Sequence, residues 1–146
     1  LRLPLALADA RGRYEIPFGA IDREQRQREE VPALRWAQVS GNLAGRPAGC
    51  LLANDCKYGH SLEGSVLRVT LIRSSFDPDI LPEIGQHEAR FALRPYPGQL
   101  PVEVAIREGE RLNHPLRLVG TDVHPGALPG LGQFVRVDCS TGSCGR

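Results

Sequence analysis

Short runs of alternating apolar and polar residues, interrupted by glycine or proline, make up most of this chain. The leucines at odd positions of residues 1–7 share one phase of a two-residue period, and Pro4 takes the other phase, which suits an edge strand. The 16 glycines and 12 prolines separate such runs along the chain, a spacing that is typical of an all-β sandwich or barrel. We therefore expect a mainly β fold.

Further strands are expected at residues 14–18, 31–39, 49–53, 65–73 and 87–96. Trp36, the only tryptophan, lies in an apolar run and is predicted to anchor the core. The clearest alternation is in residues 87–96, where Ala89, Phe91 and Leu93 share one face. We expect this segment to be an interior strand with those three side chains in the core.

One segment, residues 101–112, departs from the β pattern. Apolar or small residues recur at i, i+3, i+4 and i+7 from Val102, and Glu103 and Arg107 form an i,i+4 pair on the polar side. Alternate residues from Val102 to Ile106 also fit a strand. Because the polar residues cluster on one arc, a single short helix is favoured. The predicted fold class is thus a β-sandwich with one short helix.

Chain length and net charge limit the number of domains and the kinds of partner that can be expected. A chain of 146 residues suits one domain with a real core. With 18 Lys and Arg against 17 Asp and Glu, and both signs spread along the chain, neither a nucleic acid nor a membrane surface is an expected partner. The charged run at residues 22–30 mixes signs and is interpreted as a solvated loop.

Localisation is predicted from what the chain lacks. No stretch approaches the roughly 20 apolar residues of a membrane span, and the first ten residues do not resemble a signal peptide. Four cysteines in a chain of this length do not form a disulfide scaffold. We expect a cytoplasmic protein.

The stretch LLANDCKYGHSLEG, residues 51–64, carries the main candidate chemistry. An apolar strand ends in a polar cluster, and loops at strand ends often carry function. The candidate site residues are Asn54, Asp55, Lys57, Tyr58 and His60. An acid, a cation and a base could act together there, but an Asn-Asp pair followed by a glycine also suits an ordinary β-turn, which spacing alone favours.

Other chemistry has weaker support. Asp77 and Asp79 could pair as carboxylates for glycosidic acid–base work, although a proline-spaced turn explains them more simply. The cysteines lie in two pairs whose spacing does not fit a four-cysteine zinc site, so no metal site is expected in this chain. We find no phosphate loop, nucleophile elbow or dinucleotide fingerprint.

Several stretches carry a family resemblance, in this order along the chain: YEIPFGAI, EVPALRWAQVS, LLANDCKYGHSLEGSVLRVTLIRSS, FDPD, GQHEARFALRPYPG and LNHPLRLVGTDVHPGALP. NDCKYG followed by a glycine and an alternating strand, and then HE-x-x-F-A-L, is a specific combination. The sequence resembles the C-terminal β region of glycoside hydrolase family 38 α-mannosidases of the cytosolic and bacterial type. The likeness covers residues 5–137, nearly the whole chain.

The resemblance implies a domain at residues 1–137 with the sandwich fold of galactose mutarotase, and a disordered tail at 138–146. In this family the catalytic carboxylates and the zinc ligands lie in N-terminal and helical domains, whose motifs this sequence lacks. The chain is therefore expected to be a fragment of an enzyme that cleaves α-mannosides with retention. We expect no catalytic residue and no cofactor in it, zinc belonging to the missing N-terminal catalytic domain on which it packs.

The resemblance also implies that the NDCKYG loop helps to wall the sugar site. Asp55 would accept hydrogen bonds from sugar hydroxyls, Lys57 would donate to them, and Tyr58 would offer a ring face, with Asn54 and His60 completing the set. The alternative is a free-standing carbohydrate-binding domain, against which an aromatic content of only 5% argues. Because the family's sheet continues through more strands, an open edge and self-association are also expected.

Overall fold

The computed structural model describes residues 1–25, 29–74, 77, 83–120, 122, 125–127 and 132. Leu1–Leu116 form one compact unit and Arg117–Arg146 form a second. The predicted domain boundary at residue 137 stays a prediction. The tail expected at residues 138–146 and Asp79 of the FDPD turn lie outside the described residues.

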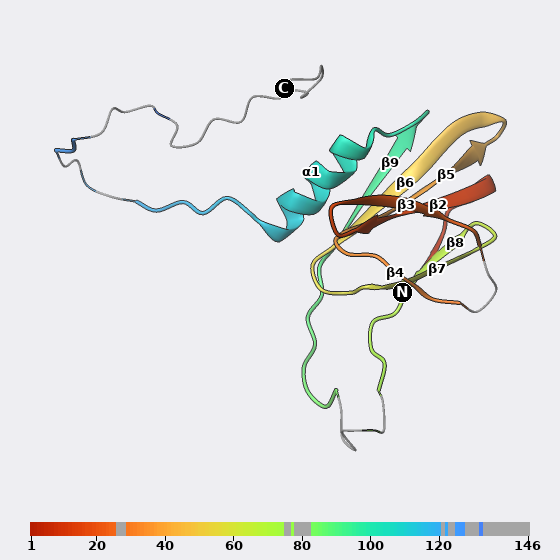
Figure 1. The fold of residues 1–146 in the computed structure, drawn as a ribbon, viewed down its shortest axis with the longest axis horizontal. Helices are drawn as coiled ribbons and strands as arrows, with labels where there is room; N and C mark the ends of the chain where they lie inside the picture. The colour runs from red at the N-terminus through yellow and green to blue at the C-terminus, as the bar shows by residue number, and fades with distance from the viewer. Residues whose placement is uncertain are drawn as a thin grey trace. The chain divides into compact units, whose positions relative to one another are not determined.

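In its described residues the compact unit has nine strands and one helix: β1 (Arg2–Pro4), β2 (Ala8–Ile16), β3 (Gly19–Arg23), β4 (Val31–Pro32), β5 (Trp36–Leu43), β6 (Arg46–Asn54), β7 (Gly59–Glu63), β8 (Val66–Val69), β9 (Phe91–Pro97) and α1 (Val102–Asn113). All strand pairs are antiparallel. They form a four-stranded sheet in the order β1-β8-β7-β4 and a five-stranded sheet in the order β3-β2-β5-β6-β9 (Figure 1). The predicted mainly β fold with a single short helix is confirmed.

The compact unit has three layers, the smaller sheet, the larger sheet and α1, with an apolar cluster between each pair of neighbours. Between the two sheets, Val39 and Leu52 of the larger sheet pack with Leu62 and Leu67 of the smaller one. On the outer face of the larger sheet, Trp36 and other side chains pack against α1. Strands β5 and β6 are therefore covered on both faces, which explains why their sequences are apolar without clean alternation.

Two local features fix the position of these layers. The turn between β5 and β6 places Ala44 and Gly45 at φ 50° and 77°, which is the pattern of a tight hairpin turn. In α1, Ala105 and Gly109 face the sheet, and a Cβ added at Gly109 would lie 3.1 Å from the Trp36 ring. The absence of a side chain at Gly109 thus allows the helix to approach the sheet closely.

The expected interior strand at residues 87–96 is wrong in part. The strand begins only at Phe91, lies at the edge of the larger sheet, and leaves Leu93 52% exposed and Phe91 only partly buried. The smaller sheet covers the inner face of the neighbouring strands but leaves Leu93 uncovered. The alternation of side chains along the strand is therefore as predicted, but Leu93 is not buried. In the same way Leu71 is 41% exposed, because β8 ends at Val69.

Three of the four outer strands, β1, β4 and β9, are poor templates for pairing with another chain; the fourth, β3, has five residues and no proline. β1 and β4 have three and two residues and contain Pro4 and Pro32. β9 carries Pro95 and Pro97, which lack the N–H that an added strand needs. Self-association through an open edge stays a prediction; β1, β4 and β9 do not favour it, and β3 is the edge that carries no proline.

Candidate functional site

The candidate loop, residues 55–58, joins β6 to β7, and Asn54 fixes its start. Asn54 is completely buried. Its Oδ1 accepts a hydrogen bond from the Lys57 backbone N at 2.7 Å, and its Nδ2 donates to the Leu34 carbonyl at 3.1 Å. This is the turn-forming use of asparagine. Asn54 therefore shapes the loop and does not present its side chain to a ligand.

Asp55 is held by Arg90, which precedes β9. The Arg90 backbone N and its Nε donate to the two carboxylate oxygens, each at 2.9 Å. Burial raises the pKa of Asp55, but the hydrogen bonds from Arg90 outweigh it and bring that pKa to about 2. Asp55 is thus a permanent anion that ties the loop to the segment leading into β9, with lone pairs left for further donors.

Lys57 and Tyr58 are the two predicted residues whose side chains make no hydrogen bond to another described residue. Lys57 is half-buried and is the only lysine of the sequence; in the described part of the chain its ammonium has no hydrogen-bond or ion-pair partner. Tyr58 is 55% exposed, so its ring does not pack in the core. The Tyr58 carbonyl accepts from the Ala33 N at 2.9 Å, which holds the backbone in place.

His60 lies in β7 with no exposed surface, so it cannot be reached from the loop's outer side. Its Nδ1 is 3.2 Å from the Tyr58 carbonyl, and its Nε2 is buried without a partner among the described residues. The ring is tilted against Tyr14, with ring centroids 6.4 Å apart. Burial lowers the pKa of His60 and favours the neutral ring. The expectation of a ligand-binding imidazole is not supported by this position.

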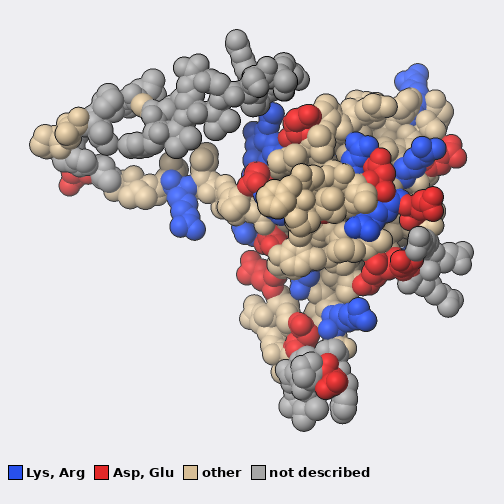
Figure 2. Space-filling model, in the orientation of Figure 1, with Lys and Arg blue, Asp and Glu red and all other residues tan. Residues whose placement is uncertain are grey.

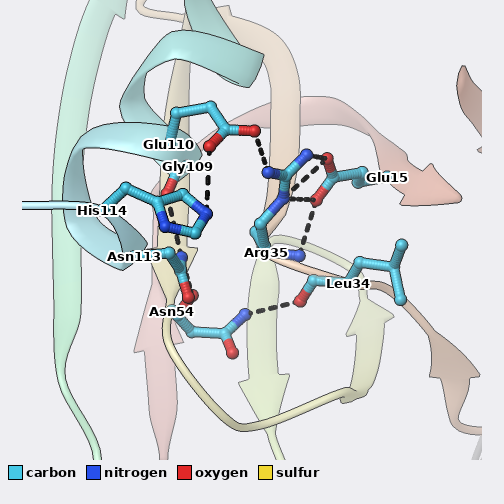
Figure 3. A network of polar contacts seen from close by, with 8 residues as sticks. All are labelled: Glu15, Leu34, Arg35, Asn54, Gly109, Glu110, Asn113 and His114. Atoms are coloured by element: carbon cyan, nitrogen blue, oxygen red, sulfur yellow. Dashed lines mark hydrogen bonds and ion pairs between the residues drawn. The ribbon is translucent and has the colours of Figure 1, made fainter. Parts of the chain in front are cut away.

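A polar network fastens the base of the loop to α1 (Figure 3). Arg35 donates from Nη2 to Glu15 at 2.6 Å and also pairs with Glu110 of the helix. Asn113 at the end of α1 donates to the Asn54 carbonyl at 3.0 Å. The base of the loop at Asn54 is therefore held by α1 and by the segment that precedes β5, which Arg35 in turn ties to Glu15 of β2.

Sequence reasoning missed Arg35, Glu15 and Arg90. They lie 20 to 75 positions from their partners, and no local pattern marks them. One signal was present: among 18 cationic residues the chain has a single lysine, and it falls in this loop.

Neither a metal site nor a membrane span is found in the described part of the chain. No group of three or more His, Cys, Asp or Glu side chains in that part could hold a metal ion. No described helix is both long and apolar enough to cross a membrane.

On the face shown in Figure 2, basic and acidic side chains lie interspersed over the compact unit.

Comparison with known proteins identifies the family. Residues 1–81 match the model of the glycosyl hydrolases family 38 C-terminal domain. Alpha-mannosidase 2C1 of Homo sapiens is 34% identical over 80% of this chain, and Alpha-mannosidase G of Dictyostelium discoideum is 35% identical over 69%. Alpha-mannosidase of Saccharomyces cerevisiae is 42% identical over 68% of the chain. The chain spans about a tenth of the length of these relatives. It belongs to glycosyl hydrolase family 38 and corresponds to part of that family's C-terminal domain.

Proposed function

We propose that this chain is a non-catalytic part of an α-mannosidase and that its 55–58 loop forms one wall of the sugar site. The observation that supports the proposal best is the construction of the loop. Asn54 and Asp55 fix the loop through hydrogen bonds with the Lys57 backbone and with Arg90, while Tyr58 is exposed and the Lys57 ammonium has no partner among the described residues. A rigid loop that presents a cation and a phenol is suited to holding a hydroxyl-rich ligand in one orientation.

The predicted residues then have two kinds of role. Lys57 donates a charge-assisted hydrogen bond to a sugar hydroxyl, and Tyr58 offers a ring face or its hydroxyl. Asp55 accepts from a hydroxyl with the lone pairs that Arg90 leaves open. Asn54 and His60 are positioning residues, because both are completely buried.

Catalysis is assigned to the portion of the enzyme outside this sequence. Glycoside hydrolysis with retention needs two carboxyl groups about 5–5.5 Å apart across the scissile bond. We propose that these groups and the zinc belong to a catalytic domain on which this β domain packs. We also propose a cytoplasmic location, since the described thiols Cys50 and Cys56 are free, as is usual in a reducing compartment.

An aryl α-mannoside assay tests the proposal in two steps. The 146-residue chain alone, with or without added zinc, is expected to show no turnover. In the longer enzyme that contains this sequence, Lys57→Ala should lower kcat/KM by about one to two decades, the equivalent of about 1.5–3 kcal/mol. Arg107→Ala is the matched control, because it removes a positive charge from the exposed face of α1.

Two results would count against the proposal. Zinc-dependent hydrolysis by the isolated chain would place catalysis within it. Equal kinetics for Lys57→Ala and Arg107→Ala would remove the loop from the sugar site and leave it an ordinary turn.

A further inference from the structure

Helix α1 covers only part of the outer face of the five-stranded sheet. It packs on β5 and β6 and near Tyr96 of β9, and it leaves Arg11 and Arg13 of β2 and Asp22 of β3 exposed. A cavity of about 700 Å³ lies there, within the usual size of ligand sites. Its lining is mainly polar: Arg11, Arg13, Asp22, Arg23, Glu24, Gln25, Gln38, Ser40 and Gln99, with Ala10, Gly12 and Leu100. No residue of the 55–58 loop takes part in it.

The floor of this cavity is fixed by hydrogen bonds within the sheet. Arg13 donates from Nε and Nη2 to the two oxygens of Asp22 at 2.6 and 2.9 Å, and this bond lowers the pKa of Asp22. Gln38, only 6% exposed, donates from Nε2 to the Tyr96 hydroxyl at 2.9 Å and to the Leu100 carbonyl at 3.3 Å. The Tyr96 hydroxyl donates in turn to Val39 at 3.1 Å. The polar groups of the floor are therefore preorganised.

One buried atom of the lining, the acceptor Oε1 of Gln38, has no partner among the described residues and lies on the same face of the sheet as Arg13 and Asp22. A buried polar atom without a hydrogen bond costs stability, so a ligand that can donate a hydrogen bond is favoured here. A hydroxyl group can donate to Gln38, whereas a fully ionised anion cannot. The carboxylates of Asp22 and Glu24 offset two of the three arginines of the lining, so the charge of the lining does not select an anion.

We propose that this cavity binds a small polyhydroxylated ligand, of the size and chemistry of a single sugar residue. The guanidinium groups of Arg11 and Arg13 donate to hydroxyl oxygens, and Asp22 and Gln38 accept from hydroxyl hydrogens. Ser40 can do either. The site is separate from the 55–58 loop and does not depend on that loop's proposed role.

The test is an NMR titration of the isotope-labelled 146-residue chain with methyl α-mannopyranoside, and separately with sulfate. Saturable shifts are expected at the amides of Arg11, Ser40 and Gln99, with a dissociation constant on the order of 1 mM, and none with sulfate. The double variant Ser40→Ala, Gln99→Ala should weaken binding about tenfold. Gln86→Ala, which changes an exposed residue outside the cavity lining, should leave it unchanged.

Several outcomes would overturn the proposal: no saturable shift with the glycoside, equal binding by the double variant, or shifts with sulfate alone, which would mark an anion site. Shifts confined to the 55–58 loop would also refute it, while supporting the proposed function of that loop. Shifts at the cavity alone would support this inference without bearing on the loop.

Discussion

Replacing Arg35 by methionine tests how the loop and the helix are held to the sheet. The Glu15 carboxylate is 4% exposed and accepts hydrogen bonds from the Arg35 backbone N, Nε and Nη2 at 2.6, 3.1 and 2.6 Å. Methionine keeps an unbranched apolar stem of similar reach but removes the guanidinium. Glu15 would then be left in the interior as a charge with only a backbone donor.

The expected cost follows from that uncompensated charge. Removing one partner of a buried ion pair costs about 3–5 kcal/mol of folding stability. Because the Arg35 side chain is 30% exposed, we expect the cost to lie at the lower end, about 3 kcal/mol. Glu110, the other partner of Arg35, is 45% exposed, so Glu110→Gln should cost less than about 1 kcal/mol. The double variant Arg35→Met, Glu15→Leu should recover much of the loss, because no charge then remains buried.

Urea unfolding followed by the fluorescence of Trp36 provides the assay. Trp36 is the only tryptophan, is completely buried and lies next to Arg35 in sequence, so its emission reports loss of this part of the core. Equal midpoints for Arg35→Met and Glu110→Gln, or a double variant no more stable than Arg35→Met, would refute the reasoning.

Further predictions concern backbone and pH effects, each measurable by the same unfolding assay. Ala44→Gly should stabilise the chain by about 1 kcal/mol, because Ala44 is exposed at φ 50°; an unchanged midpoint would contradict this. Gly109→Ala should destabilise it by about 1–3 kcal/mol, since the new methyl group meets the Trp36 ring. Asp55 has a lowered pKa of about 2, so its contribution is present above about pH 4 and is lost as the pH falls towards 2; Asp55→Asn should abolish that dependence. The lowered pKa of His60 means that stability should fall as the pH drops below about 6.5, and a His60→Asn variant with the same slope would disprove it.

Much of the fold was determined by local pattern in the sequence. Alternation located most of the strands, the clustering of polar residues on one arc identified the helix over Val102–Asn113, and the apolar setting of Trp36 predicted its complete burial. These inferences succeeded because the period of side-chain direction is a property of a strand or helix by itself. The family resemblance, also a property of the sequence, was confirmed by the match over residues 1–81.

The tertiary structure decided which faces are covered and which polar groups meet. Leu93 alternates correctly yet is exposed, because burial needs a second layer above the strand and none covers that position. His60 stands among polar residues in sequence yet is completely buried, since β7 lies inside the smaller sheet. Asp55 finds Arg90 across 35 positions because β6 pairs with β9. Strand order and register set such contacts, and the one-dimensional pattern of a single sequence carries neither.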